Sequence, residues 1–160
     1  LQHKWFAGQM DIARELKLPI AIHSRDAAQD TIQIMRASRA EEIGGVIHCY
    51  SYSKESARDF LNMGFYFGIG GVVTFKNAKK LKEAVAYIPL SNIVLETDAP
   101  YLTPEPFRGK RNDSSKLVYV AQAIADIKQI PVEKVYEATW KNAHQMYNIQ
   151  ANQNQINKEM

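Results

Sequence analysis

The chain alternates short apolar runs with longer stretches in which apolar residues recur every three or four positions. The short runs begin at Pro19, Gly45, Phe65 and Asn92 and have the length of buried parallel strands. The helical periodicity predicts six helices, and the tail from Gln150, rich in Asn and Gln, is predicted to fray. The expected helices span 2–16, 27–38, 54–63, 77–87, 114–128 and 132–147.

Local signals sharpen several of these boundaries. Asp26 is predicted to cap the second helix, with a role in catalysis as an equally weighted alternative, and Ser53 is predicted to cap the third. Gly44 and Gly45 separate the second helix from the next strand, and Gly64 ends the third helix. The pattern therefore predicts alternating strands and helices over residues 1–149.

The strand ends near residues 23, 48, 69 and 98 are separated by 25, 21 and 29 residues, which is close to the roughly 30 residues of one βα unit in a (β/α)₈ barrel. A doubly wound sheet would more often carry a glycine-rich phosphate loop, and the segment 68–71 lacks that spacing. We therefore expect the C-terminal half of a TIM-type barrel with four parallel strands. Such a half has two unpaired edges, and Leu1 already lies in a helical pattern, so we expect an N-terminal half elsewhere.

Composition and charge set broad limits. The 160 residues are 46% apolar and 23% charged, with a net charge of +3, which permits a polyanionic partner. The single cysteine, Cys49, cannot form an internal disulfide. No apolar run approaches the roughly 18 residues that cross a bilayer, and no signal peptide pattern is visible. We expect a cytoplasmic domain with no membrane association.

Three of the apolar runs end in residues that bind metals: His23, His48 and Asp98. A single histidine at a strand end is more often structural than a ligand. Three such ends at βα spacing favour a metal site, because parallel strands bring their carboxyl ends to one rim.

Five polar segments follow the strands in order. They are His-Ser-Arg-Asp-Ala at 23–27, His-Cys-Tyr-Ser at 48–51, Gly-Gly-Val-Val-Thr-Phe at 70–75, Glu-Thr-Asp-Ala-Pro-Tyr-Leu-Thr-Pro at 96–104 and Arg-Gly-Lys-Arg-Asn at 108–112. These segments resemble the successive motifs of the TatD family of metal-dependent DNases. The resemblance implies an amidohydrolase-like (β/α)₈ barrel that hydrolyses DNA phosphodiester bonds with two divalent metals. It also implies that His23, His48 and Asp98 are metal ligands at the ends of strands five, six and eight.

Two family motifs are absent from the chain: the His-x-His pair of the first strand and the metal-bridging Glu of a middle strand. By the resemblance these ligands would lie upstream of Leu1. We therefore expect that this chain alone binds metal weakly and has little nuclease activity.

The residue types suit this chemistry. Imidazole and carboxylate ligands favour Zn²⁺ or Mn²⁺, while Mg²⁺ remains open among the divalent ions. Asp98 has a second candidate role as the base that takes a proton from the attacking water. Glu96, two residues earlier, is expected on the same side of the strand and is a candidate for orienting a ligand.

Cationic and aromatic residues near the predicted rim point to DNA as the partner. Candidate phosphate-binding residues are Arg25, Arg108, Lys110 and Arg111. Tyrosine and phenylalanine rings suit stacking on unpaired bases, so we expect single-stranded DNA or frayed ends as substrate. The candidate stacking residues are Tyr50, Tyr52, Tyr101 and Phe107.

Two other interpretations of the function remain open. One is a related hydrolase that acts on small amides or lactones. The other is a non-catalytic fragment that pairs with a second copy or with its missing half through the bare strand edges.

Overall fold

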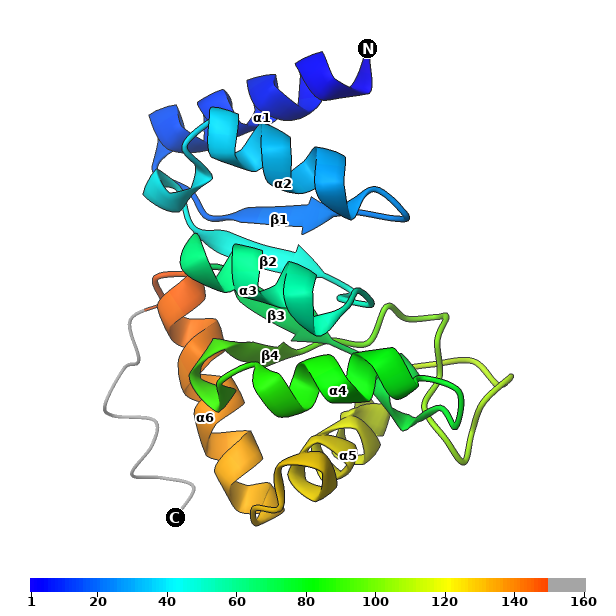
Figure 1. Ribbon diagram of the computed structural model, residues 1–160. Coiled ribbons are helices and arrows are strands. Elements are labelled where there is room, and N and C mark those ends of the chain that lie inside the picture. The colour runs from blue at the N-terminus through cyan, green and yellow to red at the C-terminus, as the bar shows by residue number, and fades with distance from the viewer. Residues whose placement is uncertain (150–160) are drawn as a thin grey trace.

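A computed structural model describes residues 1–149, so the expected tail from Gln150 lies outside the described residues. Strands and helices alternate along this part of the chain (Figure 1). The strands are β1 (Ile20–His23), β2 (Gly45–His48), β3 (Tyr66–Ile69) and β4 (Ile93–Leu95). The α-helices are α1 (Gln2–Leu16), α2 (Ala28–Ala37), α3 (Lys54–Asn62), α4 (Lys79–Tyr87), α5 (Leu117–Lys128) and α6 (Val132–Met146). Short 3-10 turns are η1 (Ala40–Glu42), η2 (Gly71–Thr74), η3 (Leu90–Asn92) and η4 (Ser114–Lys116).

The four strands form one parallel sheet in the order β1-β2-β3-β4. Each strand pairs with the next along the chain, so every connection is a βα crossover. The register aligns His23 with His48 across the first pair and Ile69 with Leu95 across the last. This is the strand order expected for consecutive units of a TIM-type barrel.

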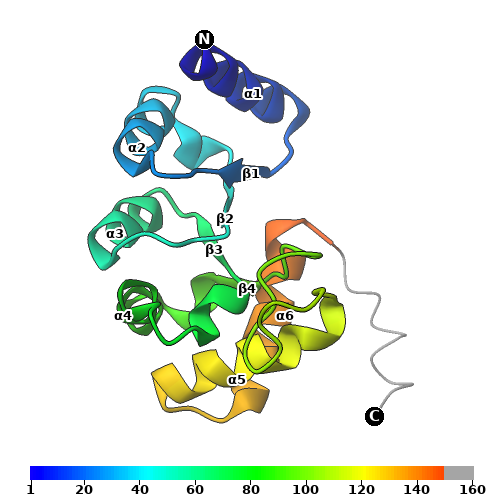
Figure 2. The same cartoon turned by 90° about the vertical axis from the view of Figure 1, so that its right-hand side faces the viewer.

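The main core lies between the sheet and the helices α2, α3 and α4, which stack along one face (Figure 2). Alternate strand residues point into it, including Ile22, Ile47 and Phe67, each at most 3% exposed. Residues between them point to the opposite face. Because this face holds His23 and His48, the alternation separates the packing residues from the candidate ligands.

Helix α6 packs against the opposite face near β4, where Met146 meets Val46 and Val94. One buried polar residue ties this helix to the sheet. Asn142 is 3% exposed, and its Nδ2 donates to the carbonyl oxygens of Leu90 at 2.8 Å and Ile93 at 2.7 Å. The acceptors lie in η3 and at the first residue of β4, so α6 is fixed to the segment that leads into β4 and toward Asp98.

The sequence located every strand and helix to within a few residues. The Ser53 cap is confirmed, because its side chain accepts a hydrogen bond from the amide of Ser56. The Asp26 cap is wrong. Asp26 has a φ of 54° and makes no cap bond, and the amide of Ala27 donates instead to the Tyr52 hydroxyl at 3.2 Å.

No helix within residues 1–149 is long and apolar enough to span a membrane.

The Asn142 contacts yield a stability prediction. Asn142→Leu leaves two carbonyl oxygens near β4 without their donor and should lower the free energy of unfolding by about 2–4 kcal/mol. Urea denaturation followed by circular dichroism measures this change. Lys141→Ala, an exposed neighbour on the same helix, should change it by less than about 0.5 kcal/mol. Equal effects of the two substitutions would rule out the anchoring role.

Candidate metal centre

The candidate centre lies at the carboxyl end of the sheet, on the face turned away from α2, α3 and α4. His23 and His48 are in register on neighbouring strands and therefore point to the same side. Their ring centroids are 5.8 Å apart, and the rings are tilted by 39°. Parallel pairing thus brings together two imidazoles that are 25 residues apart in sequence.

His48 lies between two carboxylates. Its Nδ1 is 3.0 Å from Glu96 Oε2, and its Nε2 is 3.3 Å from Asp98 Oδ1. A carboxylate can only accept hydrogen bonds, so the contact with Glu96 favours a proton on Nδ1. The lone pair of a neutral His48 then lies on Nε2 and faces Asp98. Glu96 therefore selects the tautomer that presents the unprotonated Nε2 to Asp98.

Glu96 is the more buried of the two acids, with 16% of its side chain exposed against 36% for Asp98. Burial raises the pKa of Glu96, and the adjacent His48 opposes this shift. The carboxylate fits here because Gly68 carries no side chain: a Cβ at that position would lie 1.8 Å from Glu96 Oε2. Gly68 on β3 is thus a requirement for the Glu96–His48 contact.

Two observations test whether these residues suit a cation. Glu96 Oε1 is buried and has no hydrogen-bond partner among the described residues. In addition, His48 Nε2 and Asp98 Oδ1 are both acceptors when His48 is neutral, yet they face each other at 3.3 Å. Two ligands of a tetrahedral Zn²⁺ with bonds of about 2.0–2.1 Å are separated by roughly the same distance. The His48–Asp98 pair therefore fits a divalent cation.

The set of ligands is partial. Within residues 1–149, no group of three or more His, Cys, Asp or Glu side chains is arranged to hold a metal ion. His23 approaches the pair without completing it. The candidate ligands of the described residues therefore do not make up a complete metal site.

A cleft of about 430 Å³ opens beside this cluster, between the ends of β1, β2 and β4. His23 and Asp98 line it together with Arg25, so a guanidinium group lies near the candidate ligands. Cys49 also lines the cleft. Its burial, with Glu96 and Asp98 nearby, raises the pKa of the thiol to about 11, which leaves it uncharged at neutral pH.

The other predicted phosphate-binding residues are separated from this cleft. Arg108, Lys110 and Arg111 line a second cleft of about 550 Å³, and Tyr101 and Leu102 line both. The structure thus brings His23, Asp98 and Arg25 to one cleft. His48 contacts Asp98 beside this cleft and is held by Glu96, while the remaining cations line the neighbouring cleft.

The four predicted stacking residues lie in different environments. Tyr50 is 2% exposed and packs in the main core, so its proposed contact with bases is wrong. Tyr52 is partly buried, and its hydroxyl is engaged by Ser24 at 2.8 Å. Phe107 packs edge-on against Tyr119. Tyr101, with 71% exposure, keeps a free ring.

The sequence reasoning missed two contributors. One is Gly68, whose role depends on a neighbour 28 residues away. The other is a hydroxyl network in which Ser24 contacts both Thr31 and Tyr52 at 2.8 Å and so links the loops after β1 and β2. The Ser24-Arg25 and Tyr50-Ser51-Tyr52 segments contain no sequence signal for such pairing.

Residues 1–148 match the family model described as TatD related DNase. The uncharacterized metal-dependent hydrolase YabD of Bacillus subtilis strain 168 is 46% identical over 149 residues, covering 93% of this chain and 58% of that protein. The uncharacterized metal-dependent hydrolase YcfH of Escherichia coli K12 is 39% identical over 150 residues, covering 94% of this chain and 57% of that protein.

Solved structures share the fold of this chain. The crystal structure of YJJV, a TatD homolog from Escherichia coli K12, superposes with a TM-score of 0.82 at 27% identity, covering 89% of this chain and 54% of that one. An uncharacterized amidohydrolase from Saccharomyces cerevisiae shares the fold at 16% identity with a TM-score of 0.76. The chain thus spans between half and three fifths of the length of these relatives.

The Gly68–Glu96 contact yields a prediction. Gly68→Ala should displace the Glu96 carboxylate and release His48 from the Nδ1-protonated tautomer, at a cost of about 1–3 kcal/mol in stability. Nitrogen-15 chemical shifts of the metal-free His48 ring report the tautomer. Glu96→Leu should change these shifts in the same way, and Gly8→Ala, which has open space around it, should leave them unchanged. An unaltered His48 spectrum in folded Gly68→Ala would refute this role.

Proposed function

The chain belongs to the TatD-related DNase family, and on that basis we propose that it forms the carboxyl-terminal part of a metal-dependent phosphodiesterase that cleaves DNA. The observation that carries this proposal is the His48–Asp98 pair, with its two facing acceptors 3.3 Å apart beside an open cleft. The metal-dependent hydrolase names of the Bacillus subtilis and Escherichia coli relatives support it.

The residues that would hold divalent metal are His23, His48 and Asp98, completed by ligands from other parts of the barrel. Mn²⁺ or Zn²⁺ suits this mixture of imidazole and carboxylate, and Mg²⁺ is the third candidate. When bound, two divalent ions would polarise the scissile phosphate and lower the pKa of a water molecule.

The side chains have separate roles in this proposal. Asp98 is about one-third exposed at the cleft, so it can take a proton from the attacking water. Glu96 accepts the Nδ1 proton of His48 and holds the ring in position. Arg25 at the same cleft binds a non-bridging phosphate oxygen, for which a guanidinium group is well suited.

Hydrolysis of small amides or lactones is the competing function. The cations that line the two clefts favour a phosphate-containing substrate instead. Arg25, Arg108, Lys110 and Arg111 make no ion pair with an acid among the described residues.

A chimera tests this function. Residues 1–149 would replace the matching segment of the Bacillus subtilis relative, with the unaltered relative assayed in parallel. We expect the chimera with Mn²⁺ to degrade a dye-labelled single-stranded oligonucleotide, and Asp98→Asn to lower the rate by about 10²–10⁴-fold. Asp11→Asn, an exposed acid on α1, is the matched control and should have no effect.

Turnover of a lactone or amide panel without DNA cleavage would contradict the proposal, as would full activity of Asp98→Asn. The isolated chain provides a further check. Because its ligand set is partial, calorimetric titration should detect Mn²⁺ binding weaker than micromolar. Two equivalents bound at micromolar affinity or tighter would show that the ligand set is complete without other parts of the barrel.

A further inference from the structure

The loop after β4 carries Asp98 beyond the hydrogen bonds of the sheet. The strand ends at Leu95, and the amide of Glu96 still donates to the carbonyl of Ile69 on β3 at 3.1 Å. Within residues 1–149, neither Thr97 nor Asp98 makes a backbone hydrogen bond to that strand. Asp98 also has a φ of 55°, in the left-handed region that residues other than glycine rarely adopt. Contacts from outside the sheet must therefore hold it.

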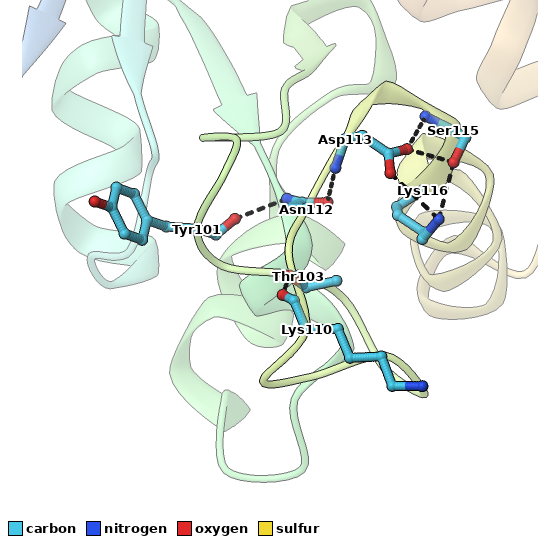
Figure 3. A network of polar contacts seen from close by, with 7 residues as sticks. All are labelled: Tyr101, Thr103, Lys110, Asn112, Asp113, Ser115 and Lys116. Atoms are coloured by element: carbon cyan, nitrogen blue, oxygen red, sulfur yellow. Dashed lines mark hydrogen bonds and ion pairs between the residues drawn. The ribbon is translucent and has the colours of Figure 1, made fainter.

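One buried side chain, that of Asn112, supplies such contacts. Asn112 is 3% exposed, and its Nδ2 donates to the carbonyl oxygens of Thr97 and Tyr101, both at 2.8 Å. Figure 3 shows the contact with Tyr101. The backbone amide of Asn112 also donates to the carbonyl of Pro100 at 3.0 Å. Both protons of one side-chain amide are thus used on the two sides of Asp98.

The Thr97 contact acts directly on the backbone of Asp98. This carbonyl belongs to the peptide group that joins the two residues, so its direction is tied to the φ of Asp98. The amide of Tyr101 donates to the carbonyl of Asp98 at 2.9 Å and closes a turn, and Asn112 holds the far end of this turn through the Tyr101 carbonyl. Rotation of the Thr97–Asp98 peptide would therefore break a buried hydrogen bond.

Asn112 is itself fixed to the main core. Its Oδ1 accepts a hydrogen bond from the amide of Asp113 at 3.0 Å, and the Asp113 carboxylate accepts one from the amide of Ser115 at 2.9 Å at the start of η4 (Figure 3). Helix α5 follows directly, and its residues Val120 and Ala121 are buried in the main core. The packing of α5 therefore holds Asn112 in place before any ligand arrives.

We propose that Asn112 is the positioning residue for Asp98, because it fixes the peptide groups on both sides of this acid and so keeps Asp98 Oδ1 at 3.3 Å from His48 Nε2. The proposal rests on the proposed function for the role of Asp98 at a metal ion. Asn112 acts through the backbone of Asp98, in the way that a supporting residue orients a metal ligand.

The outer part of the same loop has contacts of its own. The Thr103 hydroxyl donates to the carbonyl of Lys110, and the Thr74 hydroxyl accepts a hydrogen bond from the amide of Glu105 at 2.8 Å. Neither contact involves residues 97–99. Loss of one of them should therefore loosen the loop without moving Asp98, which separates a positioning role from a general effect on loop stability.

Nuclear magnetic resonance of the 160-residue chain tests the proposal without catalysis. Asn112→Leu removes both amide protons and keeps a side chain of similar size. The backbone chemical shifts of Asp98 in the metal-free protein report whether its φ stays positive, and they should move away from left-handed values. Titration with Mn²⁺, followed by broadening of the His48 ring signals, should show an affinity about 10- to 100-fold weaker than that of the parent.

Asn142→Leu is the matched control. Asn142 is equally buried and also donates to two carbonyl oxygens, but its acceptors lie in η3 and at the first residue of β4. It should lower the urea midpoint as much as Asn112→Leu does, yet leave the Asp98 shifts and the Mn²⁺ affinity unchanged. Thr103→Val, which loosens the outer loop, should also leave both unchanged. If Asn112→Leu does not fold, Asn112→Ala replaces it, because alanine also lacks both donors.

The outcomes separate this proposal from the proposed function. Asp98 shifts and Mn²⁺ affinity like those of the parent in a folded Asn112 variant would overturn the positioning role, as would an equal loss of affinity in Asn142→Leu. Neither result bears on DNA cleavage by the chimera. Conversely, a chimera that does not cleave DNA, combined with a selective loss of Mn²⁺ affinity in Asn112→Leu, would overturn only the proposed function. In an active chimera, Asn112→Leu should lower kcat about 10- to 100-fold with little change in KM.

Discussion

The register of the parallel strands is the constraint on which the candidate centre depends. It aligns His23 with His48 and places Gly68 and Glu96 on the same face at the neighbouring strands. Side chains alternate between faces, so a slip of one residue would turn His48 into the helix-covered core. The apolar residues Ile22, Ile47 and Phe67 oppose such a slip because each would lose its buried position. Hydrophobic packing on one face therefore fixes the polar geometry on the other.

The polar face carries an electrostatic cost. Glu96 is largely buried with one oxygen unpartnered, and burial raises its pKa while His48 counteracts the shift. A buried acceptor without a partner destabilises a fold by about 1–3 kcal/mol. Perturbed and incompletely satisfied groups of this kind concentrate at functional sites. A cation at the His48–Asp98 pair would favour the charged form of the Glu96 and Asp98 carboxylates. The unfavourable burial of Glu96 is thereby linked to the metal chemistry proposed for this chain.

The sequence predicts the elements well because strand and helix periodicity is set by burial of one face. It fails where geometry depends on distant partners. Asp26 does not cap α2, and the Ala27 amide beside it donates to the distant Tyr52 hydroxyl. Tyr50 packs in the core. Strand β4 ends at Leu95, so the alternation of side chains between the two faces of the sheet does not extend to Asp98. The backbone of Asp98 is not extended, because its φ is 55°. Glu96 and Asp98 instead reach His48 at its two different ring nitrogens.

In the proposed metal centre, Glu96 presents His48 Nε2 to a cation shared with Asp98. The most direct test is anomalous diffraction from crystals of the 160-residue chain soaked in millimolar Mn²⁺ or Zn²⁺, a concentration that compensates for a partial ligand set. We expect an anomalous peak between His48 Nε2 and the Asp98 carboxylate, with His48 Nδ1 still in contact with Glu96. A metal bound through His48 Nδ1, or an ordered peak elsewhere while this pair stays empty, would contradict it.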